Sequence, residues 1–281
     1  MFWGKITLDN KMKFTILGSK GFIGSNLVKY LKEEKFDVQA LDIDDKKLFS
    51  EKLGHVIYAI GVTSDFRTNS FNTIEAHVCI LNKLLKNINF DSFLYLSSAR
   101  IYYGNKNSLE ETEIKVNPTN PDNVYNISKI MGESICLSSN KTNVKIARLS
   151  NVIGEDFSSN NFVFSLIKDA INKNKIKLET SLESEKDYVS IKDVVRILLE
   201  ISINGKYKLY NVASGKNIKT QKIVDAINNE LDNKIKISDN PTKIIFPNIS
   251  IKKITDEFKF EPILILDVLP DLINKFKKFL K

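Results

Sequence analysis

Three glycines at a fixed spacing constrain the fold of this chain more than any other feature. Gly18, Gly21 and Gly24 follow the short apolar run 14–17 and precede a segment with helical periodicity. In such a strand–turn–helix unit the first glycine permits a tight turn, the second lets backbone N–H groups approach a ligand, and the third lets the helix pack against the sheet. Because the helix N-terminus carries free N–H groups and partial positive charge, the spacing predicts a site for the pyrophosphate of a dinucleotide.

Short apolar segments alternate with amphipathic segments along the first half of the chain. Strands are expected at 14–17, 37–42, 55–60, 92–97 and 144–149, and helices at 22–32, 72–87, 124–138 and 162–172. Nearly continuous apolar strands that alternate with helices are typical of a parallel sheet covered on both faces. We therefore expect an α/β fold, with a Rossmann-type doubly wound parallel sheet and a smaller α/β C-terminal lobe that binds the substrate.

The alternation becomes less regular after residue 151. Strands are expected at 175–178, 188–191 and 208–212, and helices at 192–201, 220–231 and 267–280. We expect residues 1–11 to form an N-terminal extension and residues 12–155 a dinucleotide-binding domain, whose core strands and helices continue to about residue 215. Residues 156–281 would form most of the smaller substrate-binding lobe, interleaved with the main domain.

The composition indicates which classes of binding partner are expected and which are not. The net charge is +8, but nearly all the basic residues are lysines mixed with acids along the chain. This argues against nucleic acid as a partner, while a positive surface would attract an anionic substrate. With no apolar run of ~20 residues and no leader-like start, we expect no membrane insertion and a cytoplasmic location. Cys79 and Cys136 lie in apolar helical segments and are expected to be buried thiols; with two histidines in the chain, no metal site is expected.

An acidic residue after the second expected strand bears on the choice of dinucleotide. Asp42 stands about 20 residues beyond the glycines. A carboxylate at this place can accept hydrogen bonds from the adenosine ribose hydroxyls and would repel a 2′-phosphate. Lys46 and Lys47 are near, but no arginine is. The sequence therefore favours NAD over NADP.

A second group of residues, Tyr125, Lys129 and Ser98, is suited to proton transfer from an alcohol. Tyr125 and Lys129 are four residues apart on an expected helix, and so share one of its faces. A tyrosine whose pKa is near 10 is a poor base at neutral pH, but a neighbouring ammonium favours the phenolate. The phenolate can then accept a proton from an alcohol as hydride leaves the carbon. Ser98 follows the strand 92–97, at the sheet edge where ligands bind in doubly wound folds, and can orient the reacting oxygen.

Together these motifs resemble the extended short-chain dehydrogenase/reductase family, specifically its NAD-dependent nucleotide-sugar epimerase/dehydratase branch. The similar segments, within about residues 13–215, are GSKGFIG at 18–24, the acid at 42, SSARIY at 97–102, YNISK at 125–129, RLSNVIG at 148–154, KDYV at 186–189 and YNVASG at 210–215. The resemblance implies catalytic roles for Ser98, Tyr125 and Lys129. It implies a cofactor site formed by Gly18, Gly21, Phe22, Ile23, Gly24, Asp42, Ala59, Gly61 and Lys129. It also implies a homodimer that pairs the helices around 72–87 and 124–138.

Four residues are candidates for binding a nucleotide-sugar substrate. The resemblance places Asn151 near the diphosphate, and Lys186 where the family often has an arginine, which keeps the charge but loses the bidentate geometry. Arg67 and Arg100 can each pair with a phosphate or with a carboxylate on the sugar, or can form surface ion pairs. His77 stands where the family often has asparagine, and is either a hydrogen-bonded core residue or part of a polar network beside the cofactor.

The resemblance leaves the reaction open. Family dehydratases carry an Asp-Glu pair directly after the catalytic hydroxyl residue, where this chain has Ala99 and Arg100, and the cysteine of GDP-fucose-synthase-type enzymes is missing too. We favour an NAD-dependent epimerase that removes and returns hydride on a nucleotide-linked sugar, in surface polysaccharide or deoxysugar biosynthesis. The alternative enzyme is an NAD(P)H-dependent reductase of a 4-keto-sugar nucleotide. A non-catalytic dinucleotide-binding sensor commonly loses the tyrosine or the lysine, and this chain keeps both.

Overall fold

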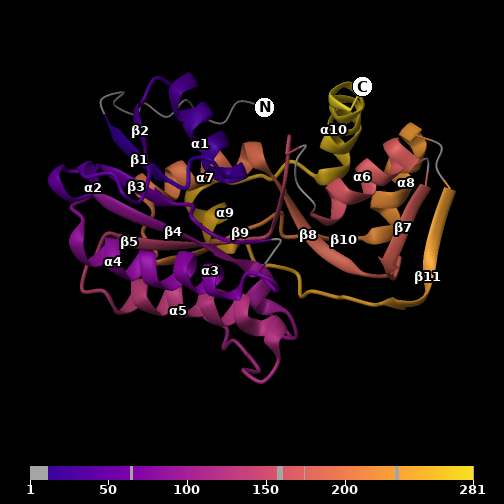
Figure 1. Cartoon of the computed structure of the whole chain (residues 1–281), viewed down its shortest axis with the longest axis horizontal. Coiled ribbons are helices and arrows are strands. Elements are labelled where there is room, and N and C mark those ends of the chain that lie inside the picture. The colour runs from indigo at the N-terminus through magenta and orange to yellow at the C-terminus, as the bar shows by residue number, and fades with distance from the viewer. Residues whose placement is uncertain (1–11, 64–65, 157–160, 174, 232–233, 281) are drawn as a thin grey trace.

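A six-stranded parallel sheet forms the larger part of the computed structural model, which describes residues 12–63, 66–156, 161–173, 175–231 and 234–280 (Figure 1). Its strands run in the order β2 (Asp37–Leu41), β1 (Lys13–Leu17), β3 (His55–Tyr58), β4 (Ser92–Ser98), β5 (Val144–Leu149) and β9 (Leu209–Val212). The order reverses beside β1, so a crevice opens there at the carboxyl ends of the strands. The predicted doubly wound parallel sheet is confirmed. The predicted extension at residues 1–11 lies outside the described residues.

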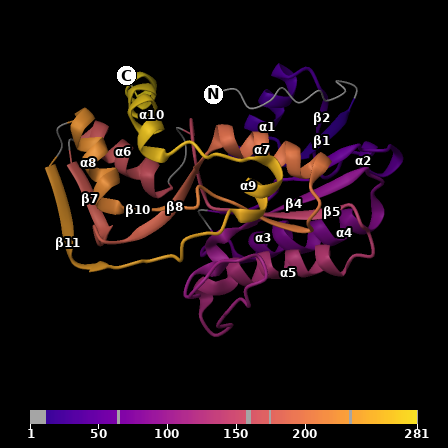
Figure 2. The same cartoon turned by 180° about the vertical axis from the view of Figure 1, so that it is seen from behind.

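Helices cover both faces of this sheet, as both views show (Figures 1 and 2). On one face pack α1 (Phe22–Glu33) and α7 (Ile191–Asn204), and on the other α4 (Ile80–Asn87) and α5 (Val124–Ser138). Successive side chains of a strand point to opposite faces, so Phe14 and Ile16 join the core under α1 while Leu17 joins the core under α4. This two-sided burial explains why the strands are apolar almost throughout.

The helix predicted at 72–87 is interrupted. It consists of α3 (Ser70–Ile74), a π-helical turn at Glu75–Cys79, and α4. Such a turn carries one residue more than a regular α-helical turn, and here it leaves His77 fully buried. Cys79 is exposed on the outer side of this turn, so the prediction that both cysteines are buried is wrong for Cys79, whereas Cys136 of α5 is buried against the sheet.

A smaller lobe has its own core. A three-stranded sheet has the order β10 (Asn217–Lys219), β8 (Glu185–Ser190) and β6 (Asn151–Ile153), and β7 (Lys175–Thr180) pairs with β11 (Lys234–Thr242). Helices α6 (Phe162–Lys173), α8 (Thr220–Leu231) and α10 (Ile265–Phe279) enclose a separate apolar cluster beside these strands (Figure 1). Between β8 and β10 the chain returns to the main sheet through α7 and β9. The lobe is therefore built from several chain segments.

The remaining elements are short connections. They are α2 (Lys47–Ser50), α9 (Lys252–Phe258) and 3₁₀ turns at Ala99–Tyr102 and Pro121–Asn123. Within the described part of the chain, no helix combines the length and apolarity needed to cross a bilayer.

Candidate active site

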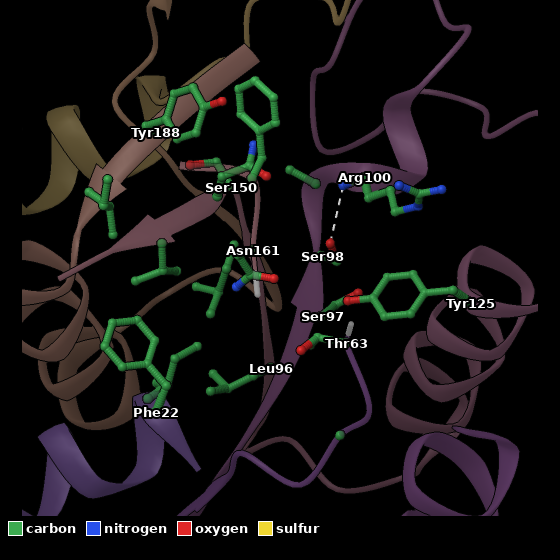
Figure 3. A pocket seen from close by; sticks show the side chains of 18 of the residues that line it. Phe22, Thr63, Leu96, Ser97, Ser98, Arg100, Tyr125, Ser150, Asn161 and Tyr188 are labelled. Atoms are coloured by element: carbon green, nitrogen blue, oxygen red, sulfur yellow. Dashed lines mark hydrogen bonds between the residues drawn. The ribbon is translucent and has the colours of Figure 1, made fainter. Parts of the chain in front are cut away.

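A cavity of about 800 Å³ lies where the carboxyl ends of the main strands face the smaller lobe. Twelve of the residues singled out from the sequence line it: Gly21, Phe22, Ile23, Ala59, Gly61, Arg67, Ser98, Arg100, Tyr125, Lys129, Asn151 and Lys186. Gly18, Gly24 and Asp42 lie outside its lining. Figure 3 shows the end of β4 and Tyr125 on one side of the cavity, and Tyr188 of the lobe and Phe22 of α1 on the other.

The three glycines of the first motif have different structural roles. Gly18 has φ +85°, and a Cβ there would lie 2.7 Å from the carbonyl carbon of Ala59. A Cβ on Gly24 would lie 2.2 Å from the Gly18 oxygen, so the fold itself requires both glycines. A Cβ on Gly21 would meet only the Gly18 oxygen, at an ordinary 3.4 Å, yet Gly21 lines the cavity at the start of α1. Space in front of a helix N-terminus fits a dinucleotide pyrophosphate.

Asp42 is paired with a residue of the glycine motif itself. Lys20 Nζ lies 2.9 Å and 3.1 Å from the two carboxylate oxygens of Asp42, and both side chains are exposed. The carboxylate can still accept hydrogen bonds from ribose hydroxyls, but the ammonium offsets its charge. Lys20 lies between the first two glycines of the motif, and no spacing rule marks it in the sequence.

Tyr125 is the second residue of α5, and its side chain is only 6% exposed. Its ring centroid lies 5.2 Å from that of Phe66 and 5.4 Å from that of His77. The phenol points toward the serines that end β4 (Figure 3). Burial raises the pKa of Tyr125, while a hydrogen bond with Ser98 and the charge of Arg100 act in the opposite direction. The structure thus brings together the phenol and the serine hydroxyl predicted to act with it.

Lys129 lies one turn after Tyr125 but directs its ammonium elsewhere. Nζ donates a hydrogen bond to the Leu96 carbonyl oxygen at 2.9 Å and lies 5.1 Å from the ring centroid of Tyr95. Burial lowers the pKa of Lys129 to about 7, and the Glu133 carboxylate only partly opposes this. Among the charged groups, Arg100 lowers the pKa of Tyr125 in this structure. That Lys129 favours the phenolate stays a prediction.

His77 connects two parts of the site. The Val62 N–H donates to Nε2 at 3.3 Å, and Nδ1 lies 2.9 Å from Ser128 Oγ, which in turn donates to the Tyr125 carbonyl oxygen at 2.9 Å. Burial lowers the pKa of His77 to about 2, so the ring is neutral. Because Nε2 accepts the Val62 N–H, we assign the ring proton to Nδ1. His77 is therefore a hydrogen-bonded core residue, as the first of the two interpretations predicts. A role in a polar network beside the cofactor stays a prediction.

Besides Lys129, three basic side chains line the cavity. Arg67 and Arg100 place their Cζ atoms 4.5 Å and 5.2 Å from the ring centroid of Phe66, and Arg67 Nε lies 2.6 Å from an Asp122 oxygen. Lys186 Nζ lies 5.3 Å from the ring centroid of Phe162. Burial lowers the pKa of Arg100 and of Lys186, and each is lowered further by a neighbouring arginine, Arg67 and Arg100 respectively. Basic residues thus outnumber the acidic residues Asp156 and Asp187 in the cavity lining.

The lobe side of the cavity is organised by Asp187, which the sequence analysis missed although it directly follows Lys186. Its buried carboxylate accepts hydrogen bonds from the N–H groups of Ser214 and Lys216 and from Ser214 Oγ. Asn151 of β6 donates to the Asp187 carbonyl oxygen at 2.8 Å. Asp187 thus ties together the strands that carry Asn151 and Lys186. The lining also includes the unpredicted residues Thr63, Phe66, Ser97, Ser150, Asn161, Phe162, Tyr188 and Phe246.

Comparisons with known proteins agree with this geometry. A putative UDP-glucose 4-epimerase of Methanocaldococcus jannaschii is 26% identical over 252 residues, covering 77% of this chain and 81% of its own. The dTDP-4-dehydro-6-deoxyglucose reductase of Escherichia coli is 23% identical over 317 residues, covering 95% and 96%. MoeE5, solved in complex with UDP-glucose and NAD, superposes with a TM-score of 0.82 at 16% identity, covering 96% of this chain and 100% of that one. The model of the NAD dependent epimerase/dehydratase family matches residues 14–213, and the chain belongs to this family.

Proposed function

We propose that this protein is an NAD-dependent epimerase that acts on a nucleotide-linked sugar by removing hydride from a ring carbon and returning it to the other face. One observation carries the proposal: Tyr125 and Ser98 meet in the same cavity as the glycine loop at the start of α1. C4 is the position of choice, because the names of both relatives refer to it.

Different residues of this chain would bind the cofactor and transfer the proton. The N-terminus of α1 behind Gly21 would hold the pyrophosphate, and Asp42 the adenosine ribose. Bound NAD supplies the hydride acceptor, and in its reduced form the donor. Ser98 would hydrogen-bond the reacting oxygen, and the Tyr125 phenolate would take the hydroxyl proton at Oη and return it when the carbonyl is reduced. The nearby charge of Arg100 favours that phenolate.

A keto-sugar-nucleotide reductase is the second candidate, since the E. coli relative that bears this kind of name aligns over 95% of the chain. Incubation of the purified protein with nucleotide sugars, without added cofactor, separates the two. An epimerase with bound NAD converts substrate to its epimer under these conditions. Turnover that occurs only with stoichiometric consumption of NADPH, and yields a reduced sugar, would contradict the epimerase.

Tyr125→Phe tests the chemical step, because it removes the phenolic oxygen and keeps the ring that packs against Phe66 and His77. We expect kcat to fall by about 10²- to 10⁴-fold while NAD still binds. Tyr207→Phe is the matched control, because Tyr207 is 48% exposed and does not line the cavity. Full turnover by the Tyr125 variant would remove this residue from the mechanism. Binding of NAD with no turnover of any sugar nucleotide by the unmodified protein would instead favour the sensor.

We further propose a homodimer formed through the outer face of α3 and α5. Large apolar side chains are exposed on these two helices, which are packed side by side: Phe71 (88% exposed) and Ile74 (40%) on α3, and Met131 (50%) and Leu137 (43%) on α5. Burial of such side chains in a second copy would stabilise the pair. Light scattering should report a dimer for the unmodified protein and a monomer for Phe71→Glu combined with Met131→Glu.

A further inference from the structure

Arg100 has an unused hydrogen-bonding group beside the reacting centre. Among the described residues, its Nε is buried and has no hydrogen-bond partner. The charge of Asp122 acts on Arg100, but the close ion pair of this carboxylate is with Arg67. A buried donor without an acceptor is costly, and the cost is removed when a ligand supplies the acceptor. The side chain lines the cavity, where such a ligand would lie.

The surroundings of Arg100 suit a planar anion. Its guanidinium lies over the ring of Phe66, whose other neighbours are Arg67 and Tyr125. Stacking on an aromatic ring restricts the orientation of the guanidinium plane, so less freedom is lost when it binds. A guanidinium held in this way presents parallel N–H groups that match the two oxygens of a carboxylate.

A sugar nucleotide can carry two anionic groups, the diphosphate and a carboxylate on the sugar. The position of Arg100 in the cavity indicates which of them it would bind. Arg100 follows Ser98 by two residues, and its charge acts directly on Tyr125. It therefore stands at the reacting end of the cavity. Lys186 and Asn151 belong to strands β8 and β6 of the lobe, and the charge of Arg100 also acts on Lys186. In a hexose that reacts at C4, the neighbouring C5 carries C6, while the diphosphate is attached to C1 on the opposite side of the ring. A group at C6 thus lies near Arg100, and the diphosphate near the lobe.

We propose that Arg100 binds a carboxylate at C6, so that the substrate of this enzyme is a nucleotide-linked uronic acid. The inference rests on the proposed function and specifies its substrate class. Lys186, the half-buried lysine of the lobe wall, remains for the diphosphate. Arg67 stands at the exposed rim in its ion pair with Asp122, and does not discriminate between C6 groups.

Matched substrate pairs test this assignment. Each pair carries the same nucleotide and differs only at C6: UDP-glucuronate against UDP-glucose, and GDP-mannuronate against GDP-mannose. For a pair that the enzyme recognises, we expect kcat/KM to be about 10- to 100-fold higher for the carboxylated member, the range of a charge-assisted bidentate contact. Arg100→Gln should remove most of this preference. Arg67→Gln should change both members of the pair alike.

The outcomes separate this inference from the proposed function. Epimerisation of both members at similar rates, or a preference that survives Arg100→Gln, would overturn the carboxylate assignment and leave the epimerase in place. Arg100→Lys keeps the positive charge but loses the bidentate geometry of the guanidinium. If its preference for the carboxylated substrate lies between the preferences of the unmodified enzyme and of Arg100→Gln, the bidentate contact is supported. Turnover of other nucleotide sugars but of no carboxylated member would overturn the carboxylate assignment alone. NAD binding without turnover of any nucleotide sugar would overturn the proposed function and this inference with it. NAD binding by each variant shows that it is folded.

Discussion

His77 Nδ1 lies 2.9 Å from Ser128 Oγ, and this contact joins the π-helical turn after α3 to the helix that carries Tyr125. The other ring nitrogen accepts a hydrogen bond from Val62, in the loop after β3 that lines the cavity beside Gly61. The neutral imidazole therefore spans the distance between this loop and the backbone of the proposed catalytic tyrosine. We infer that His77 is a positioning residue, which fixes α5 relative to the cofactor-side loop.

His77→Ala should lower kcat more than it changes KM, because a small displacement of Tyr125 weakens the proton transfer more than it weakens binding. We expect kcat to fall by roughly 10-fold or more, and stability to fall by about 1–3 kcal/mol because buried donors and acceptors lose their partner. Steady-state kinetics and urea unfolding measure the two effects. His77→Asn keeps one donor and one acceptor and should recover part of kcat. An unchanged kcat in a less stable His77→Ala protein would mean that the histidine has only a structural role.

The ion pair between Lys20 and Asp42 predicts how the enzyme discriminates between dinucleotides. Lys20→Ala leaves the Asp42 carboxylate without its counter-charge, and this carboxylate then repels a 2′-phosphate more strongly. We expect the ratio of NADP to NAD affinity to fall by roughly 3- to 10-fold at low ionic strength, and less in high salt, because the pair is exposed. Titration of each dinucleotide by calorimetry gives the ratio. Lys46→Ala, an exposed lysine after β2, is the control and should leave the ratio unchanged. The same ratio in Lys20→Ala would show that the pair plays no part in cofactor choice.

The features that the sequence predicted well are those with local causes. Strand β5 was predicted with its observed bounds, and the start of α1 was predicted at Phe22, because an apolar run and a glycine turn act within a few residues. The meeting of Tyr125 with Ser98 follows from the topology instead, since both lie at the carboxyl edge of one sheet. The short strands β6 and β10, with three residues each, gave no periodicity that could reveal them.

The features that the sequence missed depend on tertiary contacts. The π-helical turn changes which residues of 75–79 face inward, without changing the apolar composition that predicts a helix, so the exposure of Cys79 was not foreseen. The partner of the Lys129 ammonium is the carbonyl oxygen of Leu96 on a different element, which spacing along a helix cannot show. For the same reason the role of Arg100 as the cation near Tyr125 emerged only from the structure.

Lys129 should make stability depend on pH in the free protein. Burial lowers its pKa from 10.5 to about 7 in the folded state, so the unfolded chain binds the proton more tightly. The folded state therefore carries the full cost of the buried ammonium below pH 7, and this cost disappears as pH rises from about 7 toward 10.5. Lys129→Met removes the cost and should stabilise the protein by a few kcal/mol at pH 6, since each pKa unit corresponds to about 1.4 kcal/mol. The difference between variant and unmodified protein should shrink by pH 10; urea unfolding at both pH values measures it, and a gain that grows with pH would contradict the assignment.

The buried ion pair between Arg148 and Glu133 holds the strand end that carries Ser98. Arg148 Nη2 and Nε lie 2.7 Å and 2.9 Å from the two Glu133 oxygens, and Ser97 Oγ donates to Glu133 Oε1 at 2.5 Å. Arg148→Met leaves a buried carboxylate without its partner, and we expect a loss of about 3–5 kcal/mol in the free energy of unfolding. Because the carboxylate also binds Ser97, kcat should fall as the neighbouring Ser98 shifts.

A double-mutant cycle measures the interaction energy between Arg148 and Glu133. Glu133→Leu in the Arg148→Met background removes the uncompensated charge, so the double variant should be more stable than the sum of the single losses predicts, with a coupling energy above about 1 kcal/mol. The half-exposed pair of Lys13 and Glu51 is the control, where Lys13→Met should cost less than about 1 kcal/mol. Additive losses at Arg148 and Glu133 would show that the two side chains are not coupled.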